Sequence, residues 1–168
     1  MIYVHWFCAA QQRVCNGSVL VIGAGGLGSP CVLYLCAAGV GRLGIVDKDT
    51  VAMSNLHRQI AHSEAKVGQH KADSAAAACS ALNSDVQLEL HREGLRPDNA
   101  ESLCAGYDVV VDCSDNAATR YLVNDACVMA GKPLVFGAAI GMDGQLTVYN
   151  HDGGPCYRCD QCFCFQIK

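Results

Sequence analysis

The chain has 168 residues, of which 51% are hydrophobic and 17% charged. This balance is typical of one soluble α/β domain with a sizeable core and excludes a disordered chain. The formal net charge of −4 argues against a nucleic-acid-binding surface. No apolar run reaches the roughly 18–20 residues of a membrane span, and the first residues lack a signal-peptide pattern. We therefore expect a cytoplasmic protein that binds neither nucleic acid nor membranes.

Twelve cysteines are many for this length, but most of them lie in apolar periodic segments. A free cysteine behaves there as a small hydrophobic residue, so no disulfide framework is predicted. The clustered ones are in the tail, at Cys156, Cys159, Cys162 and Cys164.

The chain opens on a poorly patterned segment, residues 1–18, with at most a helical turn near residues 9–14. Next comes VLVIGAGGLG, residues 19–28, where four apolar residues predict a short buried strand and the glycines a turn too tight for a Cβ. Helical spacing follows in SPCVLYLCAAGV, with Ser29 placed as the N-cap and Pro30 at a tolerated first-turn position.

Strand, glycine turn and helix together predict a cradle for phosphate. Backbone N–H groups at such a helix start point toward an anion, and the helix dipole favours negative charge. The GxGxxG spacing, a weak signal by itself, is matched by Gly23, Gly25 and Gly28. A second strand at 42–47 ends in Asp47, 19 residues beyond Gly28. At about that distance the acidic residue of a Rossmann-type fold accepts hydrogen bonds from a ribose.

Helices and strands alternate along the rest of the chain. A polar functional loop over residues 50–71 is followed by helices expected at 71–83, 98–105 and 117–130, strands at 86–90, 108–112 and 133–139, a loop at 113–116, and an antiparallel strand at 145–149. The alternation predicts an α/β fold with a Rossmann-like doubly wound, mostly parallel sheet, helices on both faces and a C-terminal antiparallel strand. We expect a nucleotide-binding domain at 19–155 and a Cys-rich tail at 156–168.

Five motifs in register, GAGGLG, VDKDTVAMSNLHRQ, VGQHKAD, DCSDNAATR and GGPCYRC, resemble those of the ubiquitin-activating-like adenylyltransferases of the ThiF and MoeB type. That family includes a eukaryotic adenylyltransferase and sulfurtransferase. The resemblance, from about residue 18 to residue 159, implies ATP- and Mg²⁺-dependent adenylylation of the C-terminal Gly-Gly carboxylate of a ubiquitin-like sulfur carrier. The products serve molybdenum cofactor synthesis, tRNA thiolation or both. A homodimer is also implied.

The resemblance further implies which residues contact the nucleotide. Asp47 would meet the ribose, Asn116 would help to place the nucleotide, and His57 would contribute its backbone. The full implied set is Gly23, Gly25, Gly26, Gly28, Asp47, Ser54, Asn55, Leu56, His57, Arg58, Lys71, Asp115 and Asn116.

Catalysis would rest on Arg58, Lys71 and Asp115. In this family the carrier carboxylate attacks the α-phosphorus directly, so the enzyme aligns the reactants and neutralises charge on the phosphate oxygens. A guanidinium offers a fixed fork of donors and an ammonium a compact charge, while the carboxylate of Asp115 would hold Mg²⁺.

Each assignment has a structural alternative. Asp47 could merely end a strand, and Arg58 and Lys71 could be solvated surface charges. Asp115 and Asn116 could cap the helix that begins at residue 117, which does not exclude a metal role.

The tail resembles half of the family's structural Cys₄ zinc site, with Cys156 and Cys159 as two thiolate ligands. Were Cys162 and Cys164 to complete the site, almost no chain would remain to wrap the metal. Four free thiols are the alternative. The family's acceptor cysteine, its second CxxC and its sulfurtransferase domain are not found, and Arg13 lies too close to the first strand to act as the family's N-terminal arginine. We therefore expect a fragment, a variant transcript or a faulty gene model.

Two other functions stay open at this point. The shortened sequence allows a non-catalytic module that binds ATP or a partner. The GxGxxG spacing and Asp47 alone also allow an NAD- or FAD-binding oxidoreductase, although that function leaves Arg58, Lys71 and Asp115 unexplained.

Overall fold

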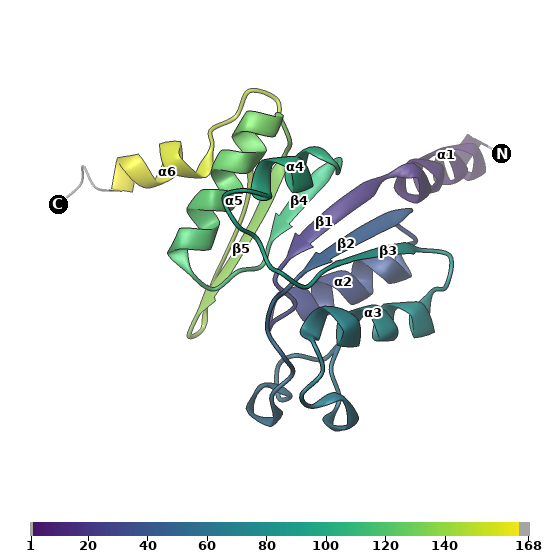
Figure 1. Ribbon diagram of the computed structural model, residues 1–168. Coiled ribbons are helices and arrows are strands. Elements are labelled where there is room, and N and C mark those ends of the chain that lie inside the picture. The colour runs from purple at the N-terminus through teal and green to yellow at the C-terminus, as the bar shows by residue number, and fades with distance from the viewer. Residues whose placement is uncertain (1, 165–168) are drawn as a thin grey trace.

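The computed structural model describes the backbone of residues 2–164 and the side chains of residues 8–160. A six-stranded sheet in the order β3-β2-β1-β4-β5-β6 forms its centre (Figure 1). The first five strands are parallel and β6 pairs antiparallel with β5, which confirms the expected fold class. The strands are β1 (Ser18–Ile22), β2 (Arg42–Val46), β3 (Gln87–His91), β4 (Val109–Asp112), β5 (Leu134–Ile140) and β6 (Asp143–Tyr149).

Helices cover both faces of the sheet. In Figure 1, α2 and α3 lie on one face of β1–β3, and α4 and α5 lie on the other face. The helices are α1 (Ile2–Asn16), α2 (Gly28–Ala37), α3 (Lys71–Leu82), α4 (Ala100–Ala105), α5 (Ala117–Ala130) and α6 (Tyr157–Cys164), with short 3₁₀ turns η1 (Met53–Asn55) and η2 (Glu64–Lys66). None of the described helices has the length and apolar character needed to cross a membrane.

The central strand β1 is apolar on both sides because it is buried on both sides. Leu20 and Ile22 belong to the hydrophobic cluster under α4 and α5, whereas Val21 belongs to the cluster under α2 and α3. Successive side chains of a strand point to opposite faces, so this short strand joins the two halves of the core.

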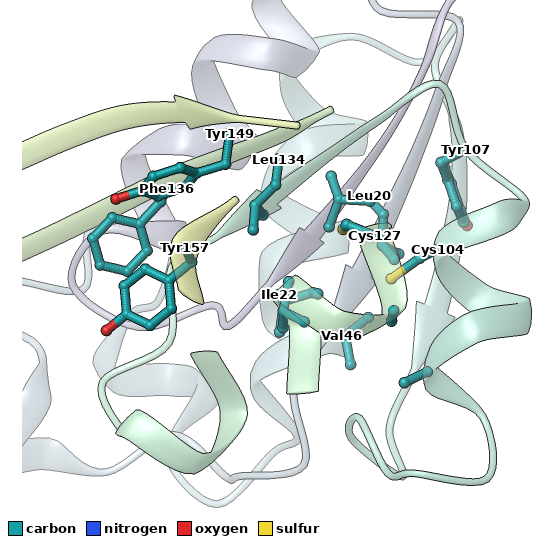
Figure 2. Close-up of a cluster of buried hydrophobic side chains, with 14 residues drawn as sticks. Leu20, Ile22, Val46, Cys104, Tyr107, Cys127, Leu134, Phe136, Tyr149 and Tyr157 are labelled. Carbon is teal, nitrogen blue, oxygen red and sulfur yellow. The ribbon is translucent and has the colours of Figure 1, made fainter. Parts of the chain in front are cut away.

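Three aromatic rings extend the first cluster toward the C-terminal helix (Figure 2). Phe136 of β5, Tyr149 of β6 and Tyr157 of α6 have ring centroids 5.2–6.1 Å apart. The Tyr157 amide also donates to the buried Asn124 Oδ1 at 2.8 Å. The first turn of α6 is thereby packed against α5 and the sheet.

The segment expected to hold at most one helical turn is instead the 15-residue helix α1. Sequence periodicity failed here because the described side chains of α1, from Cys8 to Asn16, are exposed and form no buried apolar stripe. Gln11 Nε2 donates to the Ala38 carbonyl at 2.8 Å, which ties α1 to the end of α2.

The expected N-cap of α2 is also wrong. The helix begins at Gly28, Leu27 occupies the cap position, and the cap makes no side-chain hydrogen bond. Ser29 lies inside the first turn, where its amide donates to the Gly25 carbonyl and its hydroxyl donates to the Ala24 carbonyl at 3.2 Å. α2 ends at Ala37, three residues earlier than expected, and the other boundaries lie within two residues of expectation.

The close packing of β2 generates a stability prediction. A Cβ added at Gly44 would overlap the ring of Tyr107 and lie 2.7 Å from Leu20 Cδ1. We expect Gly44→Ala to lower the free energy of unfolding by about 1–3 kcal/mol because overpacking displaces buried side chains. In the matched control Gly144→Ala, the nearest atom to the new Cβ is 4.0 Å away, so urea unfolding should show little change. Equal midpoints for the two variants would contradict the packing described here.

Candidate functional site

The sheet topology brings three loops together at the carboxyl ends of its central strands. β1 pairs with β2 on one side and with β4 on the other, with Ile22 opposite both Val46 and Asp112. The loops after β1, β2 and β4 therefore start side by side. In an open α/β sheet, the point where the strand order reverses is the usual ligand-binding edge.

The glycine turn after β1 requires glycine at its first and last positions. Gly23 has φ +92° and an added Cβ would lie 2.9 Å from the Cys113 carbonyl oxygen. An added Cβ on Gly28 would overlap the Gly23 carbonyl. The start of α2 therefore lies directly against the end of β1. Within the described part of the chain, the Gly25 and Gly26 amides donate to no acceptor, so they are free to bind an anion at a helix N-terminus.

Arg58 extends over this turn from the loop after β2. A Cβ placed on Gly26 would lie 3.6 Å from Arg58 Cδ and 3.7 Å from Nε, so the guanidinium arm borders the free amides. Asn55 Oδ1 accepts from one terminal nitrogen of Arg58 at 3.2 Å and His57 Nε2 lies 3.3 Å from the other. The structure therefore brings Arg58 and Asn55 to the glycine turn, with Arg58 exposed as a ligand-facing charge would be.

Ser54 and Leu56 belong to the same loop as Arg58 but differ in their exposure to solvent. Ser54 is exposed on η1, and Leu56 is half-buried. Within the described residues, the side chains that hydrogen-bond to Ala24 of the glycine turn are those of Asp47, Ser29 and His62, and Leu56 has no polar side-chain atom.

Asp47 directly follows β2, and its carboxylate fixes the glycine turn. One carboxylate oxygen accepts from the Ala24 amide at 2.8 Å, and the other accepts from the Asp49 amide at 2.8 Å. Each carboxylate oxygen has two lone pairs, so both retain the capacity to accept from a further donor at this edge.

Lys71 is not the solvated surface charge of the alternative interpretation. It is the first residue of α3, and its side chain is 8% exposed. Its Nζ donates to Asp49 Oδ2 at 3.1 Å, while the Asp49 side chain is 60% exposed. The buried ammonium is thus linked through Asp49 to Asp47 and the glycine turn.

The loop after β4 places Asp115 and Asn116 at the same edge, both exposed. Asn116 caps α5, since its Oδ1 accepts from the Thr119 amide at 2.8 Å. Asp115 forms no ion pair with any described residue. The capping alternative therefore holds for Asn116, and the Asp115 carboxylate remains available to a cation.

Two residues of the site were not singled out from the sequence. Gln59 is 3% exposed, its Oε1 has no hydrogen-bond partner among the described atoms, and its Nε2 would lie 3.7 Å from a Cβ on Gly25. His62 is also buried, and its two ring nitrogens lie 3.0 Å from the Ala24 carbonyl oxygen and 2.9 Å from Ser74 Oγ. Nothing in the polar stretch around them distinguishes buried side chains from solvated ones, although Gln59 stands inside the motif SNLHRQ.

The two described thiols of the tail, Cys156 and Cys159, form a close pair. Cys156 Sγ and Cys159 Sγ are 3.4 Å apart at the start of α6. Among the described residues, no group of three or more metal-ligating side chains comes together. The side chains of Cys162 and Cys164 lie outside the described residues. The ten described cysteines are free, and Cys36, Cys79, Cys104 and Cys127 pack inside the two core clusters.

The sequence pattern of the ThiF family matches residues 3–167. The chain belongs to the ThiF family. This confirms the resemblance drawn from the five motifs, and it leaves the oxidoreductase alternative without support. The adenylyltransferase and sulfurtransferase MOCS3 of Arabidopsis thaliana is 58% identical over 149 residues, and that of Mus musculus is 59% identical over 149 residues. Each alignment covers 89% of this chain and 32% of the relative, so the chain spans about a third of the length of these proteins.

Solved structures share the fold. The crystal structure of selenomethionine PaaA matches with a TM-score of 0.77 and 25% identity, over 85% of this chain and 44% of that one. The crystal structure of Escherichia coli MccB with ATP matches with a TM-score of 0.80 and 24% identity, over 94% of this chain and 48% of that one. At this level of identity the second match supports the architecture alone.

A buried carboxylate at the site edge generates a pH prediction. Asp112 is 1% exposed, one of its oxygens accepts from the Ser114 amide at 2.9 Å, and the other has no partner among the described atoms. Burial raises its pKa above the ordinary value, against the opposing effect of hydrogen bonding from Ser114. The folded state then holds this proton at pH values where the unfolded chain has lost it. This group's contribution to stability therefore falls as the pH rises from about 4 through the folded-state pKa.

We expect Asp112→Asn to be more stable than the wild type at pH 7, because the neutral amide avoids the cost of a buried charge. The difference between the two proteins should grow as the pH rises from 4 and then level off. Urea unfolding at several pH values measures it. A difference that stays constant from pH 4 to pH 8 would show that Asp112 ionises as freely in the folded as in the unfolded state.

Proposed function

We propose that this domain binds ATP with Mg²⁺ at the carboxyl edge of the sheet and adenylylates the C-terminal glycine carboxylate of a ubiquitin-like sulfur carrier. A carboxylate oxygen attacks the α-phosphorus, the bond between the α-phosphorus and the bridging oxygen breaks, and pyrophosphate leaves with the electron pair. The observation that carries the proposal is the convergence of Arg58, the Asp49-linked Lys71 and the Asp115 loop around one glycine turn with free amides.

The charges of this edge fit a magnesium nucleotide. The free amides of Gly25 and Gly26 at the start of α2 would bind phosphate oxygens, with the Arg58 guanidinium beside them. Lys71 would add a second positive charge from a position screened from water. The Asp115 carboxylate, which forms no ion pair with any described residue, suits Mg²⁺, which uses one or two protein carboxylates together with phosphates and water. Bound Mg²⁺ would neutralise charge that develops on the leaving pyrophosphate.

Asp47 is proposed as the ribose ligand. Its oxygens already accept from the Ala24 and Asp49 amides, which orients the carboxylate at the strand end. A ribose hydroxyl can donate to a remaining lone pair. The same side chain would thus shape the turn and select the sugar.

The family membership and the MOCS3 relatives support a carrier that ends in Gly-Gly and serves molybdenum cofactor synthesis or tRNA thiolation. We place this reaction in the cytoplasm and in a homodimer. The proposal concerns adenylyl transfer, since the chain aligns with only about a third of the relatives' length.

The Cys156–Cys159 pair is proposed as half of a zinc site. Its 3.4 Å thiol separation at a helix start suits two of the four thiolates of a structural zinc ion. The remaining two ligands would come from outside the described residues. Such a site would fasten the α6 end of the domain and take no part in adenylyl transfer.

The direct test is exchange of labelled pyrophosphate into ATP. We expect the purified chain to catalyse exchange with Mg²⁺ and a sulfur carrier ending in Gly-Gly, and none with the same carrier lacking its last glycine, because exchange requires the reversible formation of the acyl adenylate. ATP binding without exchange would favour the non-catalytic module instead. Absence of both would refute the nucleotide site.

Removal of the cationic groups should lower exchange without unfolding the domain. We expect Arg58→Ala and Lys71→Met each to reduce kcat/KM by about 100-fold, the usual effect of losing one group that stabilises transition-state charge. Arg92→Ala is the matched control, since Arg92 forms an exposed ion pair with Asp73 that contributes little to stability. Equal activity of Arg58→Ala and Arg92→Ala would remove Arg58 from the site.

The proposed role of Asp115 as a Mg²⁺ ligand can be tested separately, through the Mg²⁺ dependence of exchange. We expect Asp115→Asn to raise the Mg²⁺ concentration needed for half-maximal exchange by at least about tenfold, because a hard cation prefers a charged oxygen ligand. A Mg²⁺ titration of the wild type and the variant measures this shift. If the two titrations coincide, Asp115 does not hold the metal.

A further inference from the structure

A chain of hydrogen bonds leads from the glycine turn to the buried ammonium. The Ala24 amide donates to one oxygen of Asp47, and the Asp49 amide donates to the other. The Asp49 side chain accepts from Lys71 Nζ at 3.1 Å, and its carbonyl accepts from the Lys71 amide at 2.9 Å. The N–H side of the Ala24 peptide is thus connected to the first residue of α3.

A second connection returns from α3 to the same residue. Ser74 lies one turn after Lys71 and is fully buried. Its hydroxyl is 2.9 Å from His62 Nδ1, and His62 Nε2 is 3.0 Å from the Ala24 carbonyl oxygen. Together the two connections close a ring through Ala24, Asp47, Asp49, Lys71, Ser74 and His62, which we name the Ala24 ring.

The partners determine which tautomer of His62 is present. A carbonyl oxygen only accepts, so Nε2 carries the proton and donates to Ala24. In the neutral imidazole Nδ1 is then an acceptor, and the Ser74 hydroxyl donates to it. Both ring nitrogens are satisfied, and the imidazole joins the turn to α3 without a net charge.

We propose that His62 and Ser74 are positioning residues that hold the free amides of the glycine turn and the Lys71 ammonium at the separation that one bound triphosphate spans. This inference rests on the proposed function, since it assigns the ring to nucleotide binding. The free amides lie in the turn that precedes α2, whereas Lys71 is the first residue of α3. Without the His62–Ser74 connection, the Asp47–Asp49 connection would be the remaining hydrogen-bonded link from Ala24 to Lys71 among the described residues, and the exposed Asp49 side chain is half of it. Preorganised groups bind a ligand more tightly because less ordering is needed on binding.

The charges around His62 predict how the ring responds to pH. Burial lowers the pKa of His62, the hydrogen bond to the Ala24 carbonyl raises it, and among the charged neighbours Lys71 and Lys66 lower it while Asp47 raises it. The net shift is downward. The unfolded chain therefore takes up this proton first, and the contribution of His62 to stability falls as the pH drops below about 6.5 toward the folded-state pKa.

The experiment compares His62→Phe, which removes both hydrogen bonds, with His62→Gln, whose amide can donate and accept. In carrier-dependent pyrophosphate exchange, we expect His62→Phe and Ser74→Ala to raise the KM for ATP about tenfold, the effect of losing a buried hydrogen bond, with kcat changed less than about twofold. His62→Gln should recover most of the affinity. It should also lack the fall in unfolding midpoint below about pH 6.5 that we expect of the wild type.

Tyr107→Phe is the matched control, because it removes a buried hydroxyl that donates to Glu89 at 2.7 Å on the α4 side of the sheet. A KM for ATP that stays at the wild-type value in both His62→Phe and Ser74→Ala, with a loss of stability like that of Tyr107→Phe, would reduce His62 to a structural residue and overturn the inference.

A readout independent of activity separates this inference from the proposed function. The amides of Ala24 and Lys71 lie at opposite sides of the ring, and their hydrogen exchange can be measured in the nucleotide-free protein. We expect both to exchange about tenfold faster in Ser74→Ala than in Tyr107→Phe. If the wild type shows no pyrophosphate exchange, the proposed function fails, while these two rates still test the ring. Equal hydrogen-exchange rates in Ser74→Ala and Tyr107→Phe would refute the positioning role of His62 and Ser74.

Discussion

The contact between Gly28 and the Gly23 carbonyl governs the geometry of this domain. The first turn of α2 lies so close to the end of β1 that no Cβ fits between them. The free amides just before this turn face the carboxyl edge of the sheet. The buried first turn also explains why Ser29 bonds inward to Ala24 and does not cap the helix. Arg58 and Asp47 both lie against the turn that this contact closes.

Negative and positive side chains at the edge have different degrees of freedom. Lys71 is buried and held by Asp49, whereas Arg58 is exposed and held by Asn55. Asp47 is bonded through both oxygens, while Asp115 is exposed and unpaired among the described residues. The fixed charges of Lys71 and Asp47 would define where the nucleotide lies. The exposed charges of Arg58 and Asp115 can follow the phosphates and the metal as charge moves during the reaction.

The Ala24 ring and the aromatic packing of Tyr157 belong to opposite ends of the domain. The ring relates α2 to α3 beneath the proposed phosphate site, and Tyr157 packs α6 against β5 and β6. The Cys156–Cys159 pair lies on this second side. The thiol pair and the glycine turn therefore lie in separate regions of the domain, as the two roles proposed for them require.

The sequence by itself determined the alternation of elements, the glycine turn, and the motif residues from Asp47 to Asn116, because strand and helix periods and GxGxxG spacing are local properties of the chain. It did not reveal α1, whose described side chains, from Cys8 to Asn16, are exposed. Nor did it show that Lys71 is buried or that Gln59 and His62 face the turn. Those facts depend on strand order, since only the pairing of β1 with both β2 and β4 brings loops distant in sequence against the same glycines. Burial of a polar side chain is a property of that assembled edge, and a lysine or histidine has the same letter whether solvent or a carbonyl surrounds it.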